Sequence, residues 1–527
     1  MNKIDNKIET TKLHGAKYQD IFNSETLNLI ISVIVILFLI LLINSMVQTK
    51  SLNNDTITHD GFLSRAEFSE FLVYADDITR MNSTIVDGIF YVKDLDDIYA
   101  IIKNAKINNK QISVRGQFHT MGGHTIVQNG YVIDTKYLNN MYYNHNSQTV
   151  SAQCGATWGD LILYLNQFGM SPMIMQSYCT FSVGGTISVN AHGITSDYAM
   201  YESVVSITLI NHNCKLVTIT PNSELFSLVI GGYGLFGIIY EVTLKVVRNV
   251  KMTTDFNKLN IYEFKNYYEK ILTDPHVEVK IARIDITNYD YINLYTFRKS
   301  ATELNEKIIS KLDKHPKEMS RISKLLYKWI LPTHIIQKFR FGFEEIMQMP
   351  LDCNGEDRNL LVYESALPMA QLYEPIIKVD DTFILQEYFI PHDNFIKWME
   401  LIKFYLQIKS NQYTLLNITI RYVKHDTVTF LKYAYTNMFA FVFYFRIKRC
   451  YQADEELKWL HNILTQITLS LNGTFYLPYR HHYSDEQLNK AYPMINDFFN
   501  KKLKYDPRNV FSNLWYERYN SASANNI

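Results

Sequence analysis

Ser113-Val-Arg-Gly-Gln-Phe-His-Thr-Met-Gly-Gly123 is a glycine-containing segment. It begins at the end of the apolar run Gln111–Val114 and lies before a second run, Tyr131–Asp134. Both runs predict β-strands. Glycine adopts positive φ easily and lets other groups approach the backbone closely, so such a loop can direct several amide N–H groups inward. These amides would hold an anion such as a phosphate or diphosphate. Arg115 and His119 lie in the same loop and add a positive charge and an imidazole ring.

Two further glycine-rich segments follow, Val-Gly-Gly-Thr-Ile-Ser-Val-Asn-Ala-His-Gly at 183–193 and Gly-Gly-Tyr-Gly-Leu-Phe-Gly at 231–237. A single glycine loop is weak evidence, because turns need glycine for purely structural reasons. Three such segments in one strand-rich region predict a shared binding site.

The composition is typical of an ordered protein with two or three lobes, since 47% of the 527 residues are hydrophobic and 20% are charged. Lys+Arg and Asp+Glu both number 52, and this balance argues against a nucleic-acid-binding protein, which would normally carry a basic surplus. The five cysteines are scattered without a Cys-x-x-Cys pair, so neither a disulfide framework nor a metal site is indicated.

Leu27–Val47 is apolar and uncharged, and its length matches the ~20 residues that a helix needs to cross a bilayer. We expect one transmembrane anchor here, between a polar tail at 1–26 and a linker and lead-in at 48–82. A cleaved signal peptide fits less well, because the leader is long and polar and no small-residue cleavage site is present. The positive-inside bias is slight, but four Asn-x-Ser/Thr sequons would permit a body on the lumenal or outer side: Asn54, Asn82, Asn417 and Asn472.

Strand and helix signals alternate from Thr84 onward, which predicts an α+β fold. The helix predicted at Trp158–Phe168 opens with the capping-box pattern Thr157-x-x-Asp160 and stops at Gly169. A Rossmann dinucleotide unit is not indicated, because no helix follows the first glycine segment at once. Other runs predict strands at Ile85–Tyr91, Ile238–Val247, Asn359–Ser365, Thr382–Phe389, Leu415–Val423 and Met438–Phe445, and helices at Asp454–Leu471 and Asp485–Lys504.

The three glycine segments, in their order and spacing, resemble the FAD-binding domain of the vanillyl-alcohol oxidase / p-cresol methylhydroxylase (PCMH-type) flavoproteins, as found in cytokinin dehydrogenases and aldonolactone oxidases. The C-terminal motifs Tyr476-Leu-Pro-Tyr-Arg480 and Tyr505-Asp-Pro-x-x-Val-Phe-Ser512 resemble decaprenylphosphoryl-ribose oxidase and its bacterial relatives. The resemblance implies an FAD-binding domain at 83–250, a substrate or cap domain at 251–455 whose sheet covers the flavin, and a C-terminal segment at 456–527 that returns to the FAD lobe.

The resemblance also implies FAD as the cofactor. In this family the histidine of an R-G-x-x-H loop is bonded covalently to the flavin, and His119 occupies that position; relatives closest at the C-terminus often bind FAD without the bond, so both states stay open. Relatives usually carry glycine or a small residue in place of Phe118, and Cys179 lies one residue from the position of a second, cysteinyl bond. The implied FAD-binding residues are Arg115, Gly116, Gln117, Phe118, His119, Thr120, Met121, Gly122, Gly123, Gly184, Gly185, Thr186, Ser188, Asn190, His192, Gly193, Gly237 and Ile238.

Five residues of the C-terminal half are candidates for catalysis. Glu387 and Arg421 interrupt apolar strand runs, and a charge on a buried strand needs a partner or a function. Tyr479, Arg480 and His481 place a phenol, a guanidinium and an imidazole together, as acid/base chemistry on an alcohol requires. The structural alternatives are an ion pair or a solvent-facing position for the first two residues and a structural stack for the other three.

Together these features predict a membrane-anchored FAD-dependent oxidoreductase that transfers hydride from an alcohol or sugar-like carbinol to the flavin, while oxygen or another acceptor takes the electrons. The expected substrate is a small molecule or a lipid-linked one. The alternatives are amine oxidation or double-bond reduction on the same cofactor, and a catalytically silent, membrane-tethered binding protein.

Overall fold

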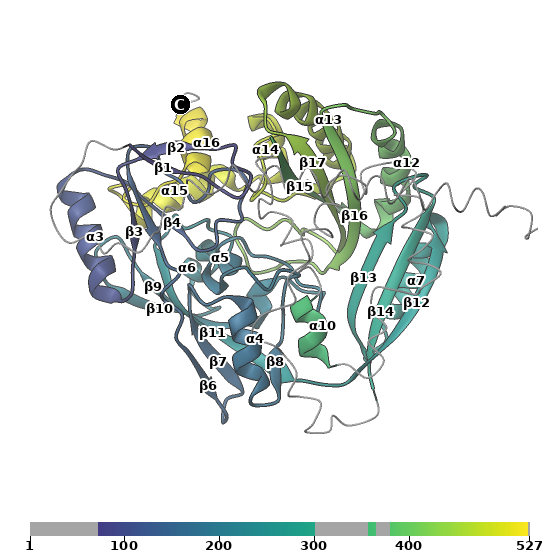
Figure 1. Ribbon diagram of the computed structural model, residues 1–527, viewed down its shortest axis with the longest axis horizontal. Helices are drawn as coiled ribbons and strands as arrows, with labels where there is room; N and C mark the ends of the chain where they lie inside the picture. Colours follow the sequence, from purple (N-terminus) through teal and green to yellow (C-terminus); the bar gives the residue numbers. More distant parts are fainter. Residues whose placement is uncertain (1–71, 196, 301–356, 365–379, 525–527) are drawn as a thin grey trace, which may run out of the picture. The chain divides into compact units, whose positions relative to one another are not determined.

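The computed structural model describes residues 72–195, 197–300, 357–364 and 380–524 (Figure 1). All of these described residues belong to one compact unit. Across these described ranges no helix is both long and apolar enough to cross a membrane. The predicted anchor at 27–47 lies outside them.

Two sheets carry the glycine segments. The smaller sheet is parallel, in the order β3 (Gly88–Tyr91), β5 (Tyr131–Asp134), β4 (Ile112–Arg115). The larger sheet is antiparallel, in the order β10 (Leu216–Ile219), β9 (Val204–Ile210), β11 (Ile238–Arg248), β7 (Thr149–Gln153), β6 (Met141–Asn144), with β8 (Met170–Pro172) on β11. The helices of this part are α3 (Leu95–Ile107), α4 (Trp158–Asn166), α5 (Val183–Ser188) and α6 (Glu224–Val229), with a 3-10 turn at Met200–Ser203.

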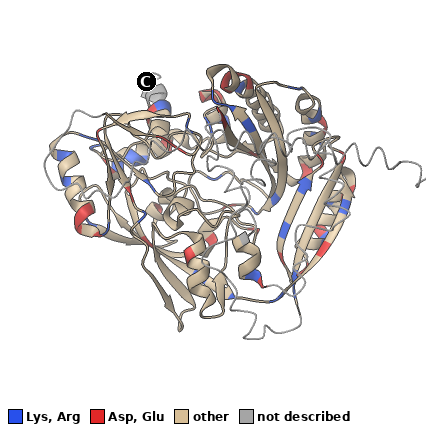
Figure 2. Cartoon of the chain, in the orientation of Figure 1, with Lys and Arg blue, Asp and Glu red and all other residues tan. Residues whose placement is uncertain are grey.

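A seven-stranded antiparallel sheet, the cap sheet, forms the second part. Its strand order is β12 (Met252–Asn260), β14 (Tyr291–Lys299), β13 (Val277–Ile284), β16 (Tyr413–Val423), β17 (Met438–Lys448), β15 (Asp381–Pro391), β18 (Thr474–Phe475). The helices α7 (Ile261–Leu272), α12 (Phe395–Leu406) and α13 (Tyr451–Ser470) pack on this sheet, and Figure 2 shows residues of both charge signs on them.

The alternation of side chains along β17 explains why the cap sheet has one filled face and one open face. Phe441 packs on Trp398 of α12 with ring centroids 4.4 Å apart, and Phe445 packs on His461 of α13 at 5.3 Å. The intervening residues Val442 and Tyr444 point to the other face and line a cavity. Successive side chains of a strand point to opposite faces, so this period of two places aromatic core on one side and a binding surface on the other.

The C-terminal segment returns to the glycine segments of the first part. The Ile112 amide donates to the Val510 carbonyl at 2.7 Å, and the Ser512 amide donates to the Ile112 carbonyl at 2.9 Å. Closer to the cavity, the Met121 amide donates to the Pro478 carbonyl at 2.8 Å. Three helices complete this segment, α14 (Asp485–Ala491), α15 (Ile495–Tyr505) and α16 (Leu514–Ala524). Leu514, the first residue of α16, packs on the small core to which Ala75 of β1 (Val73–Ala75) and Val86 of β2 (Thr84–Val86) belong.

The predicted cap of α4 is confirmed. Thr157 Oγ1 accepts from the Asp160 amide at 3.1 Å, and Asp160 accepts from the Thr157 amide at 3.4 Å, so both halves of the capping box are formed. The helix ends at Asn166, and Gly169 then adopts φ of +66°, a conformation that favours glycine.

Three other local predictions are wrong. The strand predicted at 85–91 is two strands in different sheets, because β2 pairs with β1 whereas β3 pairs with β5. The strand predicted at 359–365 is helix α10 (Arg358–Glu364), in which the Leu360 amide donates to the side chain of Asp357 at 2.9 Å. The helix predicted at 485–504 is broken into α14 and α15, because Pro493 lacks the amide hydrogen that a continuous helix needs.

Candidate active site

The first glycine segment leaves β4 and is packed tightly between other parts of the chain. Arg115 Nε donates to Asp134 Oδ2 on the neighbouring strand at 2.8 Å, which ties the start of the segment to β5. A Cβ on Gly116 would lie 2.0 Å from Ser182 Oγ, and one on Gly122 would lie 2.6 Å from the Tyr479 carbonyl oxygen. These two glycines therefore let the second glycine segment and the C-terminal segment approach the first.

Phe118 adopts φ of +40°, in the left-handed region that an aromatic residue enters only at a cost. Glycine enters this region freely, which gives a physical reason for the small residue that relatives carry here. The Phe118 carbonyl accepts from the Ile78 amide at 3.1 Å, and its ring lies 5.2 Å from the Arg115 guanidinium. These two contacts hold Phe118 in its left-handed conformation.

His119 lies at the wall of the larger cavity, which has a volume of about 180 Å³. Its ring packs against Phe181 with centroids 4.5 Å apart, and Tyr178, which stacks on Phe181, lies 6.4 Å from the His119 ring. Burial among these rings lowers the pKa of His119 to about 4. The imidazole is therefore neutral at physiological pH, with a lone pair available on one nitrogen.

The second glycine segment is a short helix rather than a loop. Ser182 caps α5 by accepting from the Gly185 amide at 3.3 Å, and a Cβ on Gly184 would lie 2.5 Å from that of Cys154. Thr186 Oγ1 accepts from Trp158 Nε1 at 2.8 Å, and Asn190 Nδ2 donates to Asp426 Oδ2 at 3.2 Å. The structure thus gives Thr186 and Asn190 internal hydrogen-bond partners.

A second cavity, of about 60 Å³, adjoins the larger one and is bounded by all three glycine segments. The two cavities share wall residues from the first two segments, including Gly116, Thr120 and Gly185. Gly234 and Gly237 of the third segment also line the second cavity, whereas Gly193 and Ile238 line neither; the neighbouring Ile239 does. Together the cavities form an elongated site.

The walls of this site fit a dinucleotide. Within the described part of the chain, Thr120 Oγ1, Thr125 Oγ1 and both ring nitrogens of His124 are buried without a hydrogen-bond partner. All three residues line the second cavity. Buried polar atoms nearly always have partners, so this cluster is suited to the hydroxyl and phosphate groups of a bound ligand. His119 and the aromatic residues of the larger cavity would then face the ring system of such a ligand.

Glu387 and His192 meet in the wall of the larger cavity. His192 Nε2 lies 2.5 Å from Glu387 Oε1, and only 4% and 2% of the two side chains are exposed. The Tyr479 hydroxyl donates to the other carboxylate oxygen, Oε2, at 3.4 Å. Of the five predicted catalytic residues, Glu387, Arg421 and Tyr479 therefore line the cavity, joined by His192 from the second glycine segment.

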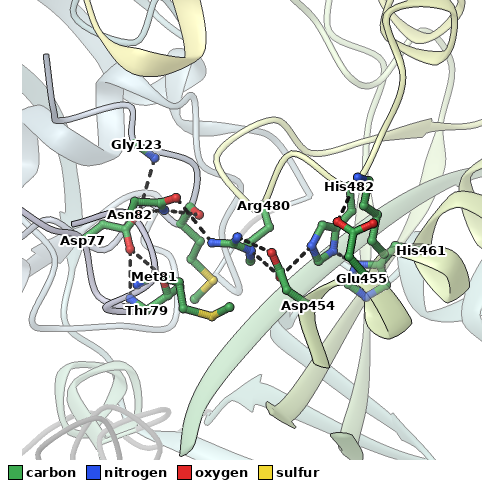
Figure 3. A network of polar contacts seen from close by, with 12 residues as sticks. Asp77, Thr79, Met81, Asn82, Gly123, Asp454, Glu455, His461, Arg480 and His482 are labelled. Carbon is green, nitrogen blue, oxygen red and sulfur yellow. Dashed lines mark hydrogen bonds and ion pairs between the residues drawn. The ribbon is translucent and has the colours of Figure 1, made fainter. Parts of the chain in front are cut away.

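Arg480 and His481 do not line the cavity. Arg480 forms a two-point contact with Asp454, through Nε at 2.8 Å and Nη2 at 2.6 Å, and its Nη1 lies 3.5 Å from Asn82 Oδ1 (Figure 3). His482 completes this network through Nε2, 2.9 Å from Asp454 Oδ1. The His481 ring packs edge-on against Tyr519 with centroids 5.5 Å apart. His481 therefore fits the structural stack stated as the alternative, whereas Arg480 is held in an ion pair.

The cysteine chemistry implied by the resemblance has no geometric support. Cys179 is buried and is absent from the walls of both cavities, and burial raises the pKa of its thiol to about 11. A thiol of this kind is chiefly protonated at neutral pH and is a poor nucleophile.

Sequence reasoning missed several wall residues. His124 was an ordinary loop residue by its context, although it stands at the end of the first glycine segment. Arg283, Asn417 and Tyr444 come from the cap strands, where the sequence shows apolar runs with single polar interruptions. The available signal was the spacing of Asn417, Thr419 and Arg421, because residues two apart on a strand share a face.

Two family models match separate parts of the chain, FAD binding domain at residues 86–220 and D-arabinono-1,4-lactone oxidase at residues 373–519. Cytokinin dehydrogenase 2 of Arabidopsis thaliana is 25% identical over 197 residues, 36% of this chain and 38% of that protein. D-arabinono-1,4-lactone oxidase of Debaryomyces hansenii is 26% identical over 176 residues, 30% of this chain and 32% of that protein. The alignments thus span less than half the length of these curated relatives.

The solved structure of 6-hydroxy-D-nicotine oxidase from Arthrobacter nicotinovorans shares the fold, with a TM-score of 0.56 over 80% of this chain and 90% of that chain at 14% identity. The sequence matches, the shared fold and the cleft between the glycine segments agree with one another. The chain is therefore similar in sequence and fold to FAD-linked oxidoreductases of the PCMH type, and the match to the FAD binding domain assigns FAD as its cofactor.

Proposed function

We propose that this chain oxidises an alcohol or sugar-like carbinol in the larger cavity. The observation that carries the proposal is the buried contact between Glu387 and His192 in the cavity wall. His192 holds one carboxylate oxygen, and the other faces Tyr479, so Glu387 Oε2 is placed to accept the hydroxyl proton of a substrate, directly or through the Tyr479 hydroxyl. Bound FAD would supply the hydride acceptor.

The residues of the glycine segments would hold the cofactor. Thr120, His124 and Thr125 offer the unpartnered polar atoms of the second cavity, and Gly234 leaves open space beside them. We assign a covalent bond to His119, because its neutral imidazole is a nucleophile at the cavity wall. Such a bond would raise the redox potential of the flavin and prevent its loss.

Amine oxidation is a second candidate, and the similarity to a cytokinin dehydrogenase favours it. A carboxylate at this position can take a proton from an amine as well as from a hydroxyl. An anaerobic titration of the purified protein with polyols, aldonolactones and cytokinins, followed by bleaching of the flavin absorption, separates the two. Bleaching by the hydroxyl compounds alone supports the first proposal, and bleaching by amines alone overturns it.

We also propose that residues 27–47 anchor the protein in a membrane, with the body on the lumenal or outer side. Of the sequons in the described part, Asn417 lines the cavity and Asn82 Nδ2 donates to the Met121 carbonyl at 3.1 Å, whereas Asn472 is exposed. A glycan on Asn472 is therefore compatible with the fold. Extraction from membranes by detergent but not by alkaline carbonate, and a glycosidase-sensitive mass lost in Asn472→Gln, would support this proposal; a carbonate-soluble chain would refute it.

A further inference from the structure

The cap sheet places positive and negative side chains at opposite ends of the cavity wall, with Arg283 at one end and Glu387 at the other. One row of cross-strand neighbours runs from Arg283 on β13 through Thr419 on β16 and Val442 on β17 to Glu387 on β15. All four side chains line the cavity. Three inter-strand steps of ~4.8 Å separate the outer strands, so the backbone positions of Arg283 and Glu387 are roughly 14 Å apart.

Arg421 adds a second guanidinium to the end marked by Arg283. It lies two residues beyond Thr419 on β16, so it shares the cavity face and is a diagonal neighbour of Arg283. Arg421 Nη2 donates to Ser177 Oγ, and its Nε is buried without a hydrogen-bond partner among the described residues. No described carboxylate lies within ion-pair distance of Arg421. Glu387, the carboxylate at the other end of the wall, is already in contact with His192.

We propose that the substrate of this site carries an anionic group, a carboxylate or a phosphoryl group, which binds between Arg283 and Arg421. Guanidinium groups match the planar oxygens of carboxylates and phosphates in two-point hydrogen bonds. The anion would fix one end of the substrate, and the carbinol would lie toward Glu387 at the other. The inference rests on the proposed function, because it takes Glu387 as the reacting end of the cavity.

The test compares three probes of similar size: D-glucitol, which is neutral, D-gluconate, which carries a carboxylate, and D-glucitol 6-phosphate. Binding to the flavin-loaded full-length chain is measured anaerobically from the change in the flavin spectrum and from the shift in thermal midpoint. At least one anionic probe should bind about tenfold more tightly than D-glucitol. The comparison between gluconate and the phosphate then identifies which anion fits.

Arg283→Gln and Arg421→Gln should each remove most of this preference, because they should weaken binding of the anionic probes far more than binding of D-glucitol. Lysine at either position should restore part of it, because the charge returns without the two-point geometry. Arg446→Gln is the matched control: Arg446 lies on β17 outside the cavity wall, with Nε 3.6 Å from Asp381, and its loss should leave the preference intact.

Equal binding of neutral and anionic probes, or a loss in the arginine variants that affects D-glucitol to the same extent, would overturn the inference. Either result leaves the proposed function standing if neutral alcohols bleach the flavin. A protein that binds the anionic probes tightly but is bleached by no hydroxyl compound would instead refute the proposed function.

Discussion

Glu387 Oε1 and His192 Nε2 lie 2.5 Å apart and join two parts of the chain that are 195 residues apart in sequence. Glu387 comes from the middle of strand β15 in the cap sheet, and His192 follows the short helix of the second glycine segment. Phe389, Tyr433 and Tyr476 surround the imidazole with ring centroids 5.7 to 6.3 Å away, which keeps water from the contact. The pair therefore couples the cap to the cofactor-binding part at the point where chemistry is proposed.

Glu387→Gln should abolish most turnover while the protein keeps its flavin. The amide cannot accept the substrate proton, so kcat should fall by about 10²- to 10⁴-fold. Tyr479→Phe, which removes only the hydroxyl that faces Glu387, should have a smaller effect. Stopped-flow measurement of flavin reduction checks the step itself; unchanged reduction in Glu387→Gln would exclude this carboxylate as the base.

His119→Ala should convert a covalently bound flavin into one that is released. Acid precipitation of the parent protein should carry the yellow colour into the pellet, whereas the variant should leave it in the supernatant. The variant keeps a cavity at this position, so it should still bind FAD reversibly. Release of flavin from the parent chain under the same conditions would show that the neutral imidazole of His119 is only a neighbour of the ring system.

Asp454→Asn should destabilise the protein by about 2 kcal/mol, because it leaves Arg480 and His482 without the carboxylate that both contact. Burial opposes ionisation of Asp454, but the hydrogen bond from His482 and the charge of Arg480 outweigh it and lower the pKa of this carboxyl. Glu455→Gln is the control on the same helix, since its pair with Lys458 is largely exposed and should contribute little. Equal thermal midpoints for the two variants would contradict this account.

Phe118→Gly should be more stable than Phe118→Ala. Both variants lose the ring beside Arg115, but only glycine relieves the left-handed conformation, which costs a non-glycine residue roughly 1 kcal/mol. At most other positions glycine is the less stable of the two, because it gives the unfolded chain more freedom. Denaturant titrations measure which of the two variants is more stable. If Phe118→Ala is the more stable, as at most other positions, φ at this position relaxes out of the left-handed region in the variant.

Acid should unfold the protein in part through its buried histidines. Burial lowers the pKa of His124 to about 3 from its ordinary value of 6.5. Between about pH 6.5 and pH 3, His124 is therefore protonated in the unfolded chain but not in the folded chain. The free energy of unfolding falls as the pH drops through this range, by up to ~1.4 kcal/mol per pH unit.

His124→Phe keeps a ring against Trp515, which lies 5.6 Å away, and removes this titration. Toward acid pH the thermal midpoint of the parent should therefore fall further than that of the variant, so the difference between them should change steadily from its value at neutral pH. A constant difference across this range would mean that His124 has the same pKa in the folded and the unfolded chain.

The cofactor-binding part could be predicted from the sequence because the patterns that indicate it are local. Glycines at fixed spacing, a capping box at Thr157 and short strands can each be recognised from neighbouring residues. The long cap strands at 382–389, 415–423 and 438–445 were also predicted, since apolar runs of this length favour strands.

The catalytic wall was harder to predict because it depends on register. Nothing local indicates that Arg283 and Glu387 stand in one row, since that row is set by pairing across four strands. Similarly, Arg480 has the composition of an active-site residue, but its partner Asp454 belongs to a helix that only the tertiary structure brings close. The charge of Arg480 indicates that it needs a partner, but only the folded structure identifies that partner as Asp454.

The absorption spectrum of the purified full-length chain tests the central claim most directly. If the three glycine segments enclose FAD, the protein should be yellow, carry one flavin per chain, and bleach when dithionite is added under anaerobic conditions. A correctly folded chain that is colourless and takes up no FAD on incubation would contradict the account.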